Sequence, residues 1–206
     1  MTLSRAAKRT FDIALSGIGL LGSSPLWLVI AAAIKIDTPG PVFYGQARVG
    51  ERGRPFRVLK FRSMVVDAER GVGPVQASAD DPRITRVGRV LRATAMDELP
   101  QLWNIFSGDM SFVGPRALRP EEIEVDSSGA SVALDRIPGF AERVSVPPGL
   151  TGIAQIYAPR DVTRRQKFRF DRLYIRRRSF LLDLRLILLS FWITFRGTWE
   201  AREKKF

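Results

Sequence analysis

The chain has 206 residues, enough for one domain with a core and accessory segments. It contains no cysteine and no histidine, which excludes thiol nucleophiles, disulfides, imidazole bases and the usual zinc sites. An enzyme of this composition would use Asp, Glu, Ser, Thr, Lys or Tyr, together with a hard, oxygen-bound metal such as magnesium. The net charge of +12 predicts a polyanionic partner: nucleic acid, anionic lipid or a phosphorylated substrate.

An uncharged apolar run lies near the N-terminus, between Ile13 and Ile34, and basic residues flank it on both sides. A helix over this run would be roughly 33 Å long, enough to cross a hydrocarbon core of about 30 Å. A cleaved signal peptide is one alternative, because the run Ala31–Ala33 resembles a cleavage site. A single transmembrane anchor is a second alternative.

The run is long for the apolar region of a signal peptide, and two features favour a re-entrant hairpin over a straight span. Ser24 and Pro25 lie at its middle, where proline removes a helix hydrogen bond, and the hydroxyls of Ser23 and Ser24 can satisfy the freed carbonyls. Both basic flanks prefer the cytoplasmic face, and each half-helix would reach only about 17 Å, or one leaflet. The sequence therefore predicts a re-entrant helix–break–helix at residues 1–36 and one cytosolic or interfacial unit at residues 37–206.

Two β-prone segments, Pro41–Val49 and Pro55–Arg62, flank a short turn at Gly50–Gly53. This arrangement predicts a β-hairpin. Lys60 and Arg62 alternate with apolar residues, so both charges would project from one face of the second strand. That face is either a solvated edge or part of a binding surface.

Arginines recur at three-residue intervals between Arg83 and Ala93, with apolar residues between them. The spacing predicts an amphipathic helix with an arginine face, preceded by a surface loop at about residues 67–81. Such a face is ordinarily solvated. Arg92 nevertheless lies close enough in sequence to Asp97 and Glu98 to share a site with them.

Two adjacent carboxylates, Asp97 and Glu98, come directly before Pro100 and an apolar-periodic run. Proline is favoured in the first turn of a helix, so we expect a helix to begin near Asp97. Asp97 would then lie near free backbone N–H groups at the positive end of the helix dipole. A simple N-cap is the alternative to a functional carboxylate.

Two loops rich in glycine and proline follow, at Ser107–Arg116 and Pro147–Gln155. Their glycines allow backbone N–H groups to turn toward an anion. Pro120–Glu122 predicts the start of a further helix. The segment Arg172–Trp199 mixes basic, aliphatic and aromatic residues, which favours a helix in the membrane interface over a buried core helix.

Seven short motifs occur in a fixed order along the chain. They are Lys8-Arg9-x-x-Asp12, Pro41-Val42-Phe43, Gln46-x-Arg48-x-Gly50, Lys60-Phe61-Arg62-Ser63-Met64, Asp97-Glu98-Leu99-Pro100-Gln101-Leu102, Gly108-Asp109-Met110-Ser111-x-Val113-Gly114-Pro115-Arg116 and Pro148-Gly149-Leu150-Thr151-Gly152. The ordered set, over nearly the whole chain, resembles the bacterial sugar transferase family, the monotopic phosphoglycosyl transferases.

The resemblance implies an α+β, mainly helical membrane protein with a re-entrant helix broken at Ser24-Pro25, a β-hairpin and interfacial amphipathic helices. It implies transfer of a hexose 1-phosphate from a UDP-sugar to undecaprenyl phosphate with release of UMP, at the cytosolic face of the cytoplasmic membrane. By resemblance, Asp97 is the nucleophile that forms a covalent phosphosugar intermediate, and Glu98 is its partner. Both are associated with Mg²⁺. The pathway would be exopolysaccharide, O-antigen or glycoprotein assembly.

Phosphate chemistry also needs cations, because both steps bring anions together. Lys60, Arg62, Arg92 and Arg116 are the candidates, each within or next to a family-like motif. The chain departs from the family where a Gly-Arg pair usually follows the second glycine-rich loop, and we expect Arg160 to replace that arginine.

Partner classes follow from the same observations. We expect a UDP-sugar, a polyprenyl phosphate and an anionic membrane, and long interfacial helices also favour a homodimer. The alternative function is that of a membrane-tethered, basic nucleic-acid-binding protein, for which the charge and the interleaved aromatic residues are typical. The apolar N-terminal run argues against it, because free nucleic acid offers that run no apolar partner.

Overall fold

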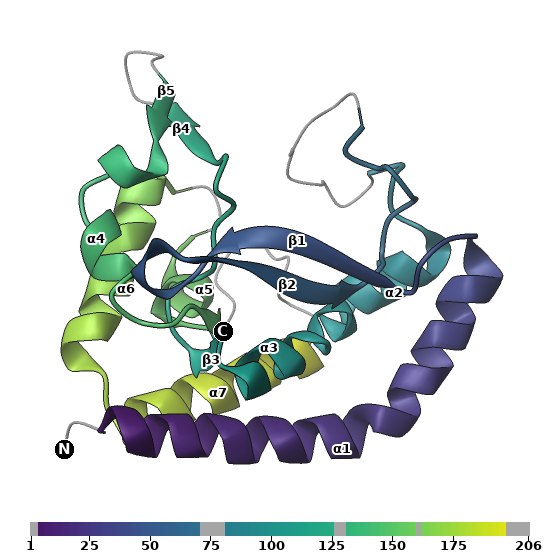
Figure 1. The fold of residues 1–206 in the computed structure, drawn as a ribbon, viewed down its shortest axis with the longest axis horizontal. Helices are drawn as coiled ribbons and strands as arrows, with labels where there is room; N and C mark the ends of the chain where they lie inside the picture. The colour runs from purple at the N-terminus through teal and green to yellow at the C-terminus, as the bar shows by residue number, and fades with distance from the viewer. Residues whose placement is uncertain (1–3, 71–80, 126–130, 160–161, 197–206) are drawn as a thin grey trace.

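The computed structural model describes residues 4–70, 81–125, 131–159 and 162–196. Over these residues the fold is α+β and mainly helical, with three separate two-stranded sheets (Figure 1). The helices are α1 (Arg5–Asp37), α2 (Arg86–Ala93), α3 (Gln101–Ser107), α4 (Phe140–Arg143), α5 (Ile153–Tyr157), α6 (Arg164–Arg177) and α7 (Phe180–Phe195), with 3₁₀ turns at Glu51–Gly53, Met96–Glu98 and Leu134–Arg136. The strands are β1 (Phe43–Val49), β2 (Pro55–Phe61), β3 (Ser111–Val113), β4 (Ile123–Val125), β5 (Ser131–Ala133) and β6 (Gly149–Thr151).

The N-terminal apolar run forms one continuous helix, α1, that contains Pro25 and bends along its length (Figure 1). Pro25 has no N–H to offer the carbonyl of Leu21, and the hydroxyl of Ser24 donates to that carbonyl at 2.8 Å. Ser23 likewise donates to the carbonyl of Gly19 at 2.7 Å. The predicted break is therefore a bend within an unbroken helix, because the serine hydroxyls satisfy the carbonyl groups that a break would expose.

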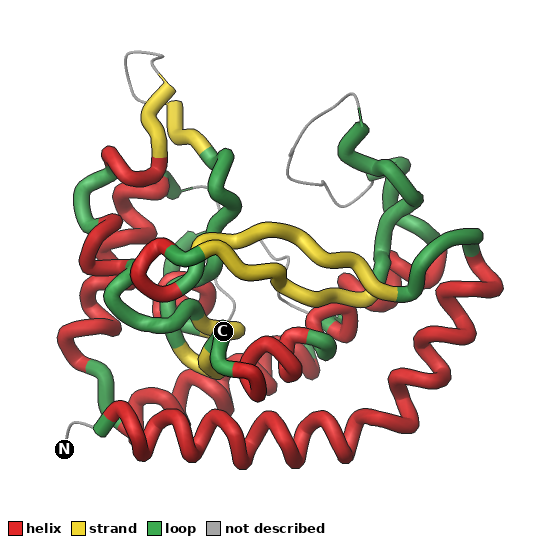
Figure 2. Tube along the Cα trace, in the orientation of Figure 1, coloured by secondary structure: helices red, strands yellow, loops and turns green. Residues whose placement is uncertain are grey.

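The predicted hairpin is confirmed. Strands β1 and β2 pair antiparallel, with Phe43 opposite Phe61 and Val49 opposite Pro55, and Figure 2 shows them as two long yellow strands lying across the helices. Helix α3 packs against β2 through the buried side chain of Asn104. Its amide oxygen accepts from the N–H of Leu59 at 2.9 Å, and its amide nitrogen donates to the carbonyl of Arg57 at 2.8 Å. Asn104 thus completes the backbone hydrogen bonds of β2.

Helix α2 begins at Arg86, not at Arg83 as the arginine spacing predicts. The hydroxyl of Thr85 accepts from the N–H of Gly88 at 2.9 Å and caps the helix. Arg83 lies outside it, in an ion pair with Asp81 at 2.6 Å. The predicted loop before this helix lies mostly in residues 71–80, which are outside the described residues.

The two glycine-rich loops come together in space, because β3 pairs in parallel with β6. A Cβ at Gly149 would lie only 2.0 Å from the backbone nitrogen of Gly114, so this close approach requires glycine. The segment after Arg116 turns directly into β4, so the helix predicted to begin at Pro120 is absent from the described residues. In its place β4 pairs with β5.

The C-terminal segment forms two helices, α6 and α7, because Ser179 starts a new helix by accepting from the N–H of Leu182 at 3.2 Å. Helix α7 has a buried side, as the core-helix alternative predicts, and an exposed apolar side. Leu186 and Ile193 are fully buried in the main core, while Leu188 and Phe191 are exposed on the opposite side. The main core also takes side chains from α3, β3 and α5.

Side chains at both ends of α1 hold it to the rest of the molecule. Near its start, Arg9 donates to the carbonyls of Ile105 and Phe106 at the C-terminal end of α3, at 2.5 and 2.7 Å. Beyond its end, Arg62 donates to the carbonyls of Pro39 and Thr38 at 2.5 and 2.7 Å. These contacts join α1 to α3 and to the end of β2.

Candidate active site

The two adjacent carboxylates lie in a 3₁₀ turn that connects α2 to α3. Ala95 has a left-handed backbone (φ 53°, ψ 17°), which ends the path of α2 and turns the chain into the 3₁₀ turn. The α-helix then begins at Gln101, with Pro100 at its N-cap position. The predicted helix start is therefore a 3₁₀ turn followed by α3, and the N-cap interpretation of Asp97 is wrong.

A lysine from the hairpin lies between the two carboxylates. The Nζ of Lys60 is 3.7 Å from Oδ2 of Asp97 and forms a close ion pair with Oε1 of Glu98. Lys60 reaches the two carboxylates because the side chain of Asn104 in α3 binds the backbone N–H of the preceding residue, Leu59. The alternative of a solvated strand edge is therefore wrong for Lys60.

The pKa values of the two carboxylates are shifted in opposite directions, although the residues are neighbours in sequence. Burial raises the pKa of Asp97 above its ordinary value, and the charge of Lys60 offsets this only in part. Burial also acts to raise the pKa of Glu98, but the charges of Lys60 and Arg116 and hydrogen bonds from Lys60 and Gln101 outweigh it and hold that pKa at about 2. Perturbed, interacting carboxyl groups of this kind are typical of active sites.

A small hollow of about 20 Å³ opens beside Glu98. Two of the predicted cations, Lys60 and Arg116, line it, together with Gln101. A third cation, Arg48, also lines the hollow and is not among the predicted site residues. Its position in the motif Gln46-x-Arg48-x-Gly50 was the available signal, and the observed register places Arg48 on the same face of the hairpin as Lys60.

The other predicted site residues lie in different surroundings. The charge of Arg92 lowers the pKa of Asp97, so this arginine acts on the carboxylate pair. Arg62 is buried and is engaged with the loop after α1, so the structure does not bring it to the pair. Arg160 lies outside the described residues. Ser24 and Pro25 lie within α1.

The carboxylate pair is the candidate site for the predicted magnesium ion. Among the described residues, no three His, Cys, Asp or Glu side chains lie close enough together to hold a metal ion. Mg²⁺ in phosphate-transferring proteins usually binds one or two carboxylates and completes its shell with water and substrate phosphates. Asp97 and Glu98 fit that pattern, and a substrate phosphate would have to supply further oxygens.

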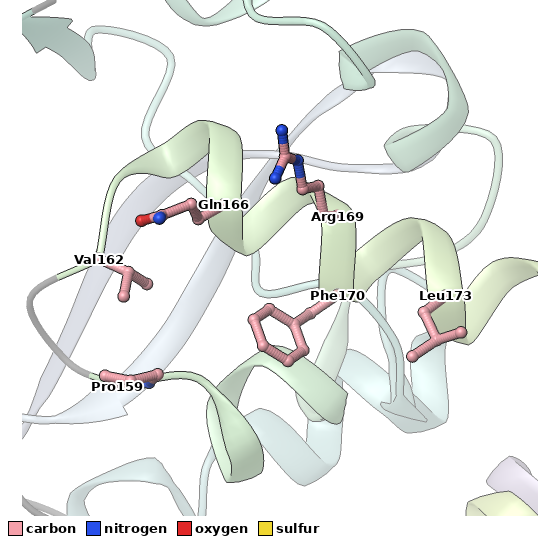
Figure 3. A pocket seen from close by; sticks show the side chains of 6 residues that line it. All are labelled: Pro159, Val162, Gln166, Arg169, Phe170 and Leu173. Atoms are coloured by element: carbon pink, nitrogen blue, oxygen red, sulfur yellow. The ribbon is translucent and has the colours of Figure 1, made fainter.

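A larger, open hollow of about 450 Å³ lies beside α6 and shares no lining residue with the carboxylate site (Figure 3). Its walls are mainly apolar. The lining residues are Pro159, Val162, Gln166, Arg169, Phe170 and Leu173. Because it holds one charged group and no carboxylate, the carboxylate site is the better candidate for chemistry.

The chain is similar to known proteins over most of its length. The family model described as bacterial sugar transferase matches residues 3–197. A UDP-glucose:undecaprenyl-phosphate glucose-1-phosphate transferase of Klebsiella pneumoniae is 42% identical over 188 residues, which is 89% of this chain and 39% of that protein. The exopolysaccharide production protein ExoY of Sinorhizobium fredii is 36% identical over 195 residues, which is 88% of this chain and 82% of that protein.

A third relative is named for a different sugar. A Bacillus subtilis protein, named provisionally as an undecaprenyl-phosphate N-acetylgalactosaminyl 1-phosphate transferase, is 45% identical over 139 residues, which is 68% of this chain and 73% of that protein. Several relatives are longer than this chain. The chain spans 39% of the length of the Klebsiella pneumoniae protein and 38% of a UDP-glucose:undecaprenyl-phosphate glucose-1-phosphate transferase of Xanthomonas campestris. It spans 35% of an undecaprenyl-phosphate glucose phosphotransferase of Komagataeibacter xylinus.

Proposed function

The chain belongs to the bacterial sugar transferase family, and on this premise we propose that it transfers a sugar 1-phosphate from a UDP-sugar to undecaprenyl phosphate and releases UMP. The observation that carries the proposal is the pair of unlike carboxylates, Asp97 and Glu98, which share Lys60 beside a cation-lined hollow. The family match favours this function over the nucleic-acid-binding alternative.

The reaction we propose has two displacements at one phosphorus atom. An Oδ of Asp97 attacks the phosphorus that carries the sugar, the bond from that phosphorus to the bridging oxygen breaks, and UMP leaves with the electron pair. An oxygen of undecaprenyl phosphate then attacks the same phosphorus. The bond to Asp97 breaks, and the product is a lipid-linked diphosphate sugar. Asp97 is the nucleophile because its raised pKa gives a more basic oxygen than that of Glu98.

Cations make these steps between anions feasible. A unit charge 4 Å from a phosphate oxygen contributes about 4 kcal/mol at an effective dielectric of 20, before desolvation is subtracted. Lys60 and Arg116 line the hollow and are suited to this role, and Arg92 acts on Asp97. Glu98 and Asp97 would hold Mg²⁺, which when bound would neutralise further phosphate charge.

We place the protein at the cytosolic face of the cytoplasmic membrane, with α1 as a re-entrant helix. Among the described helices, α1 is the one that is long and apolar enough to cross a membrane. Exposed apolar side chains on α1 (Leu21, Leu28), α3 (Trp103) and α7 (Leu188, Phe191) support contact with lipid. These helices lie together at the lower side of the view in Figure 1.

The test of the function is turnover in detergent micelles with undecaprenyl phosphate and a panel that includes UDP-glucose and UDP-N-acetylgalactosamine. We expect release of UMP, and we expect Asp97→Asn to abolish both turnover and a phosphosugar adduct seen by intact-protein mass spectrometry. Glu121→Gln, outside the hollow, is the matched control. Full activity of the Asp97 variant would remove the nucleophile from the mechanism.

The topology has a separate test, which the absence of cysteine from the chain makes direct. Ser4→Cys and Thr38→Cys place single thiols at the two caps of α1. A membrane-impermeant maleimide applied from the cytosolic side should label both positions. Labelling of the two positions from opposite sides would show a spanning helix.

A further inference from the structure

One face of the hairpin carries a row of polar side chains along β1. Alternation along the strand and the pairing of Tyr44 with Lys60 place Tyr44, Gln46 and Arg48 on the same face as Lys60. The side-chain amide of Gln46 donates to the hydroxyl of Tyr44 at 3.2 Å. The guanidinium of Arg48 donates to the amide oxygen of Gln46 at 2.5 Å. Gln46 therefore fixes the orientation of Arg48.

Arg48 reaches the candidate active site from this strand. Its side chain is only 12% exposed, and it lines the hollow that also contains Lys60 and Glu98. One guanidinium nitrogen donates to the carbonyl of Ala117 at 3.1 Å and lies 3.7 Å from a carboxylate oxygen of Glu122. A largely covered arginine that is held on several sides is a rigid, preorganised donor.

The hollow beside Arg48 is lined by three cations (Arg48, Lys60 and Arg116) and by one carboxylate, Glu98. Burial and the charges of Arg116 and Arg119 lower its pKa to about 10. The nearby carboxylates are shared, since Glu98 pairs closely with Lys60 and Glu122 also pairs with Arg164 at 2.7 Å. An incoming diphosphate would supply the negative charge that this part of the hollow lacks.

On the basis of the proposed function, we propose that Arg48 binds the phosphate of the donor that leaves as UMP, and that Gln46 positions its guanidinium. As the bond between phosphorus and the bridging oxygen breaks, that oxygen gains a full charge, and Arg48 would donate to it. The backbone of the next residue, Val49, donates to the carbonyl of Leu118 at 2.8 Å, so this end of β1 adjoins the loop after β3. In the view of Figure 1, β2 lies between β1 and the middle of α1, and this placement favours the water-soluble donor over the lipid phosphate.

The test compares UMP with uridine, because only UMP carries the phosphate. The full chain in detergent micelles is titrated calorimetrically with each ligand. We expect Arg48→Gln to weaken UMP binding by about 10- to 100-fold, the range for hydrogen bonds to charged groups, and to leave uridine binding unchanged. Gln46→Ala should produce a smaller loss of UMP affinity, again without a change for uridine.

The control is Arg57→Gln, which removes the same charge from the opposite face of the same hairpin, where Arg57 is exposed. It should bind UMP as the wild type does. Arg48→Lys keeps the charge without the forked geometry and should show an intermediate loss, which keeps the test usable if Arg48→Gln fails to fold.

Three results would overturn the inference. Equal losses for UMP and uridine would indicate a structural role. A rise in the KM for undecaprenyl phosphate with unchanged UMP binding would assign Arg48 to the lipid phosphate. Unchanged UMP binding in a folded Arg48→Gln variant would leave the proposed function intact and remove the role of Arg48. If the wild type neither binds UMP nor releases it from a UDP-sugar, the proposed function fails as well.

Discussion

The two carboxylates of the site should respond in opposite ways when their charges are removed. Glu98 has a pKa of about 2 against an ordinary value of 4.5, which corresponds to at most about 3 kcal/mol of stability at neutral pH. Its side chain is 24% exposed, and screening by water reduces this to about 1 to 2 kcal/mol. Glu98→Gln should therefore lower the Tm by about 2 to 8 °C, since 1 kcal/mol corresponds to about 2 to 4 °C in a chain of this size. Asp97→Asn should leave the Tm unchanged or raise it, because burial disfavours the carboxylate that this change removes.

The dependence of stability on pH should also differ between the two carboxylates. The folded pKa of Glu98 is below its unfolded value, so its stabilisation is full above about pH 5 and is lost as the pH falls toward about 2. The folded pKa of Asp97 is above its unfolded value of 3.8, so its effect has the opposite sign: the wild type loses stability as the pH rises through the folded pKa. Thermal unfolding in detergent, followed by tryptophan fluorescence from pH 3 to 8, measures both trends.

A clear result would refute this reasoning. If Asp97→Asn were the more destabilising variant at neutral pH, the ion pair of Lys60 with Glu98 could not be the main electrostatic contact of the site. Asp135→Asn removes an exposed carboxylate outside the hollow, and it controls for general loss of negative charge.

Three further outcomes are expected. Lys60→Met removes a charge that lowers the pKa of Asp97, so the acid limb of the pH profile of kcat/KM should move to higher pH. The rate of UMP release should also fall by about 100-fold. An acid limb at the wild-type pH would contradict this. Asn104→Ala leaves two backbone groups of β2 without their partner and should lower the free energy of unfolding by roughly 2 to 4 kcal/mol in denaturant titrations, whereas a neutral effect would mean that water replaces the amide. Asp171→Asn removes the carboxylate that lies 2.7 Å from the buried guanidinium of Arg143, and the free energy of unfolding should fall by about 3 to 5 kcal/mol. The double variant that combines Asp171→Leu with Arg143→Met should largely avoid this loss.

Local patterns were sufficient for the hairpin and for the carboxylate pair. Alternation in β2 and the turn at Gly50–Gly53 determine the pairing, and the structure has it as predicted. The strand pattern also placed Lys60 on a defined face, although only the packing of α3 shows what that face meets. Adjacent carboxylates before a proline identified the candidate site, but the left-handed residue Ala95 could not be foreseen, because a non-glycine residue rarely takes that conformation.

The remaining errors come from contacts between segments that are far apart in sequence. Arg62 has the same alternation as Lys60, yet β2 ends one residue before it, and its side chain turns to the carbonyls after α1. Thr85 shortened the arginine-rich helix by offering a cap that spacing alone did not weigh. Asn104 carries no motif signal that marks it as the partner of a strand, because its role exists only once α3 lies against β2.

With α1 in the membrane as proposed, its attachment at both ends would make the bilayer a mechanical element of the site. Arg9 of α1 donates to a carbonyl at the C-terminal end of α3, and the N-terminal end of α3 follows the carboxylates. Arg62, two residues after Lys60, donates to a carbonyl in the loop after α1. A change in bilayer thickness that altered the bend of α1 would change the distance between Arg9 and the loop held by Arg62. The distance between Lys60 and the carboxylates would then change as well. Turnover in vesicles should therefore depend on acyl-chain length even when the concentration of the lipid acceptor is held constant.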